Sequence, residues 1–213
     1  VLALLVGICV MGGGKRIEKT AAFIVPFMGV AYVVVTVVVL LMHAGRIPAV
    51  FGRIFTDAFN FRAIFGGIAG SCLVYGIKRG LYSNEAGVGS APNAAAAAVV
   101  SHPAKQGLVQ MLSVYIDTII LCNATALMCL VSGVEPTAEL AGAQWVQTSL
   151  QAVLGNFGPI FITVAMLLFS FTTLIGNLYY CDNALAYLNH KTMPSQGFLK
   201  GFRIYGVIVI FVG

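Results

Sequence analysis

An acidic residue, Asp117, stands in the middle of a long apolar stretch and is the one charged residue in residues 107–132. In a membrane-spanning helix such a group costs at least about 2.5–3.5 kcal/mol, and ionisable residues found there usually serve a function. Asp117 is therefore a candidate for binding a cation, with a bond to a neighbouring helix as the alternative. Asn123 and Thr125 follow about two helical turns later and are predicted to extend the same polar face.

A second apolar stretch, residues 157–180, carries no charge but is interrupted by small or polar residues: Ser170, Thr172, Thr173, Gly176 and Asn177. Hard cations such as sodium prefer hydroxyl, carboxylate and carbonyl oxygens, which replace the hydration shell of the ion. The pair Thr172 and Thr173 is therefore a candidate cation site. The alternative is that these hydroxyls bond to carbonyls of their own helix.

A short apolar stretch at residues 63–79 is rich in glycine, which has a poor helix propensity. Broken helices of this kind form the binding sites of secondary transporters, because unwound backbone survives in a membrane only where protein or a cavity satisfies it. The alternative is close helix packing through small residues. Its glycines Gly66, Gly67 and Gly70 make this stretch a candidate for such unwound backbone.

The next stretch, Gly80–Ala97, is too polar for an ordinary span and too apolar for a solvated loop. Its Gly-x-Gly is followed by Ser-Ala-Pro rather than by a lysine, which argues against a phosphate-binding loop. The chain has no Gly-x-Ser-x-Gly and no His-Glu-x-x-His, and its three histidines lie in linkers. A membrane-embedded enzyme therefore has no visible nucleophile or metal site.

Composition explains why these polar residues stand out. Of the 213 residues, 59% are hydrophobic and 9% are charged, whereas a soluble domain carries about 25% charged residues. A soluble enzyme and a nucleic-acid binder are thereby excluded, and an integral membrane protein is indicated. The five cysteines show no C-x-x-C spacing, so neither a zinc site nor a disulfide framework is suggested.

Hydrophobic segments of suitable length predict an all-α polytopic membrane protein, forming a single transmembrane domain. The approximate spans are residues 1–11, 21–42, 63–79, 107–132, 157–180 and 204–213, and the apolar ends suggest a fragment of a longer protein. Nine of the 12 Lys and Arg residues fall in alternate linkers, which predicts that linkers 12–20, 80–106 and 181–203 are cytoplasmic. Amphipathic stretches at residues 47–59 and 144–154 are then external, the second with Trp145 as an interfacial anchor.

The string GLYSNEAGVGSAPNAAAA at residues 80–97 resembles the signature region of the alanine/glycine:cation symporter family, also called the sodium:alanine symporter family. Four flanking strings agree: VPFMGVAYVV (25–34), HPAKQGLVQML (102–112), IDTII (116–120) and FSFTTLIGNLYY (169–180). The resemblance covers nearly the whole chain in motif order. The matching signature residues are Asn84, Glu85, Gly87, Gly89, Ser90 and Pro92.

This resemblance implies the inverted-repeat fold of leucine transporters, of which the chain matches about helices four to nine of the ten-helix core. It implies that Gly66–Ser71 is the unwound part of a broken helix that binds substrate. It places sodium-binding hydroxyls on Thr172 and Thr173, and substrate contacts on Thr173 and Asn177. Asn177 stands where the family commonly has Trp, so a larger or more polar amino acid than alanine becomes conceivable.

The expected function is sodium-coupled symport of a small neutral amino acid, of the alanine or glycine type, across the bacterial cytoplasmic (inner) membrane. We expect a secondary active transporter rather than an enzyme, with sodium as coupling ion, no cofactor, the lipid bilayer as partner and no nucleic acid. The alternatives are a proton-coupled carrier, a glutamine- or serine-preferring carrier, a channel, or an inactive truncated fragment. Half of the substrate site is expected to lie in the first repeat, before Val1.

Overall fold

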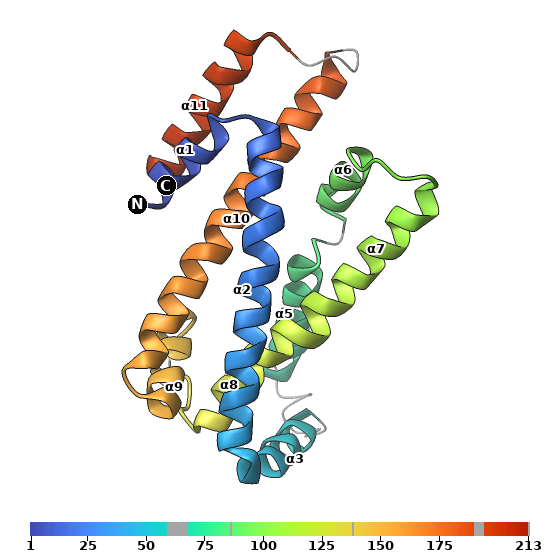
Figure 1. Cartoon of the computed structure of the whole chain (residues 1–213). Coiled ribbons are helices and arrows are strands. Elements are labelled where there is room, and N and C mark those ends of the chain that lie inside the picture. The colour runs from blue at the N-terminus through green and yellow to red at the C-terminus, as the bar shows by residue number, and fades with distance from the viewer. Residues whose placement is uncertain (59–67, 86, 138, 190–193, 213) are drawn as a thin grey trace. The chain divides into compact units, whose positions relative to one another are not determined.

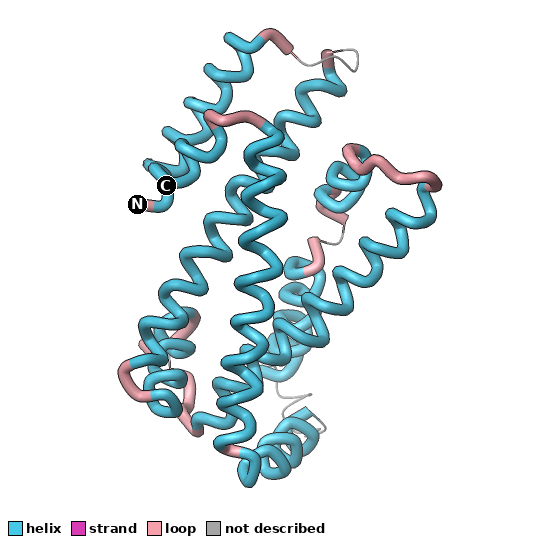
Figure 2. The backbone as a smooth tube through the Cα atoms, viewed as in Figure 1, coloured by secondary structure: helices cyan, strands magenta, loops and turns pink. Residues whose placement is uncertain are grey.

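The computed structural model describes residues 1–58, 68–85, 87–137, 139–189 and 194–212. These described residues form helices joined by short turns and contain no strand, so the prediction of an all-α protein is confirmed (Figure 2). The helices are α1 (Leu2–Val10), α2 (Gly14–Met42), η1 (Ala44–Arg46), α3 (Ile47–Ala58), α5 (Ile68–Ser83), α6 (Ser90–Ala96), α7 (Pro103–Tyr115), η2 (Ile116–Cys122), α8 (Asn123–Ser132), α9 (Ala143–Leu154), α10 (Phe157–Leu188) and α11 (Gln196–Val212).

Three helical runs in the described residues are long and apolar enough to cross a membrane. They are α2, the continuous run Pro103–Ser132 formed by α7, η2 and α8, and α10. These runs contain the predicted spans 21–42, 107–132 and 157–180. The shorter helices α1, α5 and α11 fall on the other three predicted segments, and α3 and α9 form in the two amphipathic stretches.

The chain divides into two compact units. Unit 1 comprises Val1–Val30, Gly89–Gly107 and Val164–Gly213, and unit 2 comprises Ala31–Val88 and Leu108–Thr163. The long helices α2 and α10 each contribute residues to both units. Segments of the two units therefore alternate along the chain, and each unit is assembled from segments that are distant in sequence.

Unit 1 has an apolar core in which α1 lies beside α11 (Figure 1) and packs on α2 and α10. The fully buried residues Val6, Val10 and Ile175 lie at its centre. The chain turns from α1 into α2 at Gly13, whose φ of +85° is a left-handed conformation that glycine adopts at no steric cost. This turn allows two helices that follow each other in sequence to share one core.

Unit 2 combines an apolar core with hydrogen bonds between spans. Met128, Val39 and Leu150 are fully buried, and they come from α8, α2 and α9. The Tyr32 hydroxyl lies 2.7 Å from the Thr125 hydroxyl, which links α2 to α8. In apolar surroundings such a bond satisfies two groups that would otherwise be costly to bury, so it fixes the two helices in register.

Candidate cation and amino acid site

The signature string forms the reversal from α5 into α6. The Asn84 side-chain amide donates to the carbonyl oxygen of Gly80 at 2.9 Å and so caps the end of α5. Glu85, Gly87 and Gly89 then adopt positive φ angles of 52°, 81° and 97°. Glycine is favoured in that region because it has no Cβ, so the Gly-x-Gly spacing serves a tight backbone turn.

The remaining signature residues begin α6. Ser90 and Pro92 lie in its first turn, and the Ser90 hydroxyl is buried without a hydrogen-bond partner in the part of the chain that the structure describes. Asn93, in the same string, donates its side-chain amide to the Tyr180 carbonyl oxygen at 3.1 Å. The signature is thus tied to α10 of unit 1 through a residue that the sequence analysis did not single out.

The end of α5 meets η2 in a cluster of polar side chains within unit 2. The Ser83 hydroxyl donates to the Asp117 carboxylate at 2.5 Å, and the Thr118 hydroxyl donates to the side-chain oxygen Oδ1 of Asn84 at 2.9 Å. Asp117 and Thr118 are half-buried. We name Ser83, Asn84, Asp117 and Thr118 the oxygen cluster. The cluster includes two residues that were predicted from the sequence: Asn84, directly after α5, and Asp117, in η2.

Sequence reasoning missed Ser83 and Thr118. Each is the immediate neighbour of a residue that was identified, and each carries a hydroxyl, so adjacency was the available signal. The four side chains of the oxygen cluster together supply carboxylate, hydroxyl and amide oxygens, which hard cations prefer. The cluster carries a single negative charge, on Asp117. This combination is suited to a monovalent cation.

The η2 segment that carries Asp117 is π-helical, which is uncommon and occurs frequently at functional sites. The wider turn alters the pairing of backbone carbonyls with later amides. The Asn123 side-chain amide donates to the carbonyl oxygens of Thr118 and Ile119, at 3.2 and 3.0 Å. Asn123 therefore supports the backbone of the segment.

The three residues of the predicted polar face, Asp117, Asn123 and Thr125, have different hydrogen-bond partners. The π-helical segment changes the angular spacing on which that prediction rested. Asn123 bonds to backbone carbonyls and Thr125 pairs with Tyr32, whereas Asp117 pairs with Ser83. Of the three, Asp117 alone belongs to the oxygen cluster.

The hydroxyl and amide residues of α10 lie in unit 1. The Thr172 hydroxyl donates to the carbonyl oxygen of Phe169 at 3.0 Å, which is the bond within its own helix that was the alternative reading. Thr173 and Asn177 lie one turn apart on an exposed face and make no side-chain hydrogen bond to the described residues. Both groups face away from the core residue Ile175 and are accessible to a ligand.

The glycine-rich segment is only partly described. Gly66 and Gly67 lie outside the described residues. Ile68, Ala69, Gly70 and Ser71 are the first residues of α5 and are α-helical, so the prediction that they are unwound is wrong. Glycine propensity is a weak preference that tertiary context overrides, and helical hydrogen bonds satisfy the backbone in apolar surroundings.

A family model for the sodium:alanine symporter family matches residues 1–213. The chain belongs to the sodium:alanine symporter family. It is 42% identical over its whole length to a putative sodium/proton-dependent alanine carrier protein, YrbD, of Bacillus subtilis (strain 168) and 38% identical to the sodium/alanine symporter AgcS of Methanococcus maripaludis; each match covers 46% of the relative. A probable sodium/glutamine symporter of Bacillus subtilis, GlnT, is 41% identical over the whole chain and 43% of the relative. The chain therefore spans less than half the length of these curated relatives of the symporter family.

The family is one of symporters, and the apolar helices of this chain indicate a multi-pass membrane protein. Relatives named for alanine and for glutamine are similarly close to this chain. Overall identity therefore does not distinguish one amino acid substrate from another. The distinction must come from individual side chains in the site.

Proposed function

We propose that the whole transporter to which this chain contributes carries a small neutral amino acid into the cell by symport with sodium. The oxygen cluster carries this proposal, because it places the carboxylate Asp117 in a span with hydroxyl and amide oxygens beside it. Each cation moving inward contributes about 2.3 kcal/mol per 100 mV of membrane potential, which is sufficient to drive accumulation.

In this proposal the fold is the inverted-repeat fold of leucine transporters, in the bacterial cytoplasmic membrane. Asp117 and its neighbours attract or bind sodium in unit 2, and the hydroxyls of Thr172 and Thr173 bind sodium in unit 1. Thr173 and Asn177 contact the amino acid. The exposed positions of Thr173 and Asn177 support this assignment, since both polar groups are accessible on α10.

Uptake by the full-length protein in lipid vesicles tests the proposal. Labelled alanine should accumulate when an inward sodium gradient is imposed, and unlabelled alanine, glycine, serine and glutamine should compete in an order that identifies the substrate. Uptake that follows a proton gradient alone would favour the proton-coupled alternative. Uptake indifferent to both gradients would overturn symport.

The substitution Asp117→Asn tests the carboxylate. The amide retains an oxygen for Ser83 but removes the negative charge, so half-saturation by sodium should require about tenfold more sodium, equivalent to about 1.4 kcal/mol of binding free energy. The matched control is Thr125→Val, which lies in the same helical run and removes the bond to Tyr32. The control should leave the sodium requirement unchanged, and an unchanged requirement in Asp117→Asn would remove Asp117 from the cation site.

A further inference from the structure

The first turns of α2 carry two exposed cations, Arg16 and Lys19, just before the apolar stretch that begins at residue 21. Together with Thr20, Phe23 and Ile24 they line a groove of about 540 Å³ within unit 1. These five positions follow the i, i+3, i+4, i+7, i+8 pattern of a single helix face. The groove therefore changes along the helix axis from charged to apolar.

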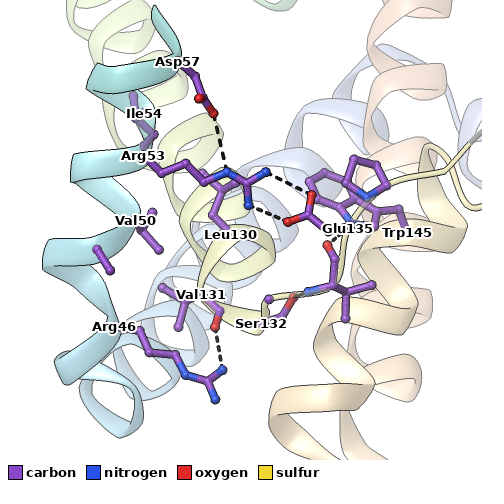
Figure 3. A pocket seen from close by; sticks show the side chains of 14 residues that line it. Arg46, Val50, Arg53, Ile54, Asp57, Leu130, Val131, Ser132, Glu135 and Trp145 are labelled. Carbon is purple, nitrogen blue, oxygen red and sulfur yellow. Dashed lines mark hydrogen bonds and ion pairs between the residues drawn. The ribbon is translucent and has the colours of Figure 1, made fainter.

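The two cations of the groove differ from an arginine that is already neutralised. In unit 2, Arg53 donates through Nη2 to a carboxylate oxygen of Glu135 at 3.0 Å (Figure 3). Within the part of the chain that the structure describes, neither Arg16 nor Lys19 forms an ion pair. Their charges are therefore available to an anion.

The acidic residue between these two cations, Glu18, belongs to another face of α2. Its carboxylate accepts the hydroxyl hydrogen of Tyr179 in α10, at 2.7 Å. Residues one or two positions apart on a helix do not face each other. Glu18 therefore leaves the positive charge of the groove without compensation.

The polar end of the groove is supported by the preceding turn and by α1. A Cβ built on Gly12 would overlap the Arg16 side chain, so this side chain occupies space that only glycine leaves free. The Cys9 thiol of α1 donates to the Thr20 hydroxyl at 3.7 Å. Arg16 is thus partly ordered before a ligand binds, which lowers the entropic cost of binding.

The apolar end of the groove continues as a stripe along α2. Phe23, Phe27 and Val30 recur at intervals of four and three residues, and all three side chains are exposed. The stripe extends about 10 Å at 1.5 Å per residue, which is most of one leaflet of a hydrocarbon core about 30 Å thick. Contacts between membrane helices favour small residues, whereas two phenylalanines protrude here. The stripe therefore fits an acyl chain better than another helix.

We propose that this face of α2 binds an anionic phospholipid such as phosphatidylglycerol. The headgroup phosphate lies between Arg16 and Lys19, and an acyl chain follows Phe23, Phe27 and Val30. Side chains three residues apart on a helix have Cβ atoms about 5–6 Å apart, so one phosphate reaches both cations, whose N–H groups donate to its oxygens. The inference goes beyond the proposed function, since it involves neither the amino acid nor the coupling ion.

Native mass spectrometry of the full-length transporter, purified in detergent and depleted of lipid, tests the charged end of the site. Phosphatidylglycerol is titrated, and the Kd of the tightest bound lipid is measured. The double variant Arg16→Gln with Lys19→Gln should raise this Kd about thirtyfold, equivalent to about 2 kcal/mol for two cations at a membrane surface. The control Lys105→Gln removes an exposed cation from the predicted linker 80–106 and should leave the Kd unchanged.

A second pair of variants tests the apolar end. Phe23→Ala should raise the Kd about fivefold, because it removes apolar area that the acyl chain covers. Phe211→Ala is the matched control, since Phe211 is an exposed phenylalanine of unit 1 in α11. Two further probes define the ligand: phosphatidylcholine, which has no net charge, should bind at least about tenfold more weakly, and glycerol 3-phosphate, which lacks acyl chains, should not displace the lipid.

The outcomes distinguish a lipid site from its alternatives. Equal affinity for phosphatidylcholine, or displacement by glycerol 3-phosphate, would overturn the assignment to an anionic lipid. Unchanged binding in the double variant is the result expected if another helix of the full-length transporter covers this face, and it would overturn the site. The titration contains no amino acid and no sodium gradient, so a failure of sodium symport would leave its result intact.

Discussion

The two units differ in how exposed their ion pairs are to solvent. In unit 1, Asp182 of α10 and Arg203 of α11 form a buried ion pair, with side chains 5% and 10% exposed and Nη2 2.6 Å from Oδ2. In unit 2, Arg53 and Glu135 form an exposed pair, with side chains 56% and 61% exposed. Removing water makes an unpaired charge costly, so the buried pair constrains its unit far more strongly than the exposed one.

Arg203 also lies close to the backbone turn that joins α1 to α2. The Arg203 Nη1 lies beside the turn at Gly13, where a side chain would approach the guanidinium. The second Arg203 bond, from Nε to Oδ2, is 3.2 Å. Asp182 and Arg203 thus connect α10 to α11 through buried side chains, whereas the exposed pair joins α3 to the segment between α8 and α9. The difference teaches that location, rather than the number of bonds, determines the energetic importance of an ion pair here.

The largest expected effect comes from breaking the buried pair with Arg203→Met. The variant leaves the Asp182 carboxylate buried without a cation, so the free energy of unfolding should fall by about 3–5 kcal/mol. Denaturant unfolding of the full-length protein in detergent measures this change. The control is the double variant Asp182→Leu with Arg203→Met, which leaves no unpaired charge and should recover most of the stability. A single variant as stable as the parent would show that the pair does not constrain unit 1.

A smaller effect is expected from Trp145→Phe in unit 2. The substitution keeps an aromatic ring but removes the N–H that donates to Val134, so stability should fall by about 1 kcal/mol. Tyr115→Phe is the matched control, because Tyr115 is exposed and its hydroxyl has no hydrogen bond to the described residues. Thermal unfolding in detergent compares the two variants, and equal losses in both would argue against a structural role for the indole bond.

The smallest effect is expected from Glu135→Gln. At neutral pH the stability should be nearly unchanged, because exposed ion pairs contribute little. The Arg53 guanidinium holds the pKa of Glu135 below its ordinary value of about 4.5. The stabilisation is therefore present above that ordinary value and is lost as the pH falls through the lowered value of the folded protein.

Unfolding measured in detergent at neutral pH and in steps below pH 4.5 checks the sign of this effect. Any stability difference between the parent and Glu135→Gln should shrink toward zero as the solution becomes more acidic. A difference that grew in acid would contradict the pairing of Glu135 with Arg53. A loss comparable with that of Arg203→Met would remove the contrast between the two units.

The sequence by itself determined the helical class, the long apolar spans and the symporter family. Helical periodicity and hydrophobic length are local properties, and the string Gly80–Ala97 is specific without reference to any other part of the chain. Asp117 could also be identified as a candidate, because a single carboxylate in an apolar run is costly wherever it packs. The helical backbone of Ile68–Ser71 could not be seen in the sequence, because the low helix propensity of glycine suggested unwinding.

Only the tertiary structure determined which side chains pair with one another. Ser83 meets Asp117 across 34 residues, Arg46 meets Val131 across 85, and Arg203 belongs to a buried pair although its sequence position indicated a linker cation. The π-helical geometry of Ile116–Cys122, the segment that carries Asp117, was likewise not predicted. Such contacts depend on how helices pack, and packing is determined by the shapes of side chains distant in sequence. Composition and periodicity carry no information about those distances.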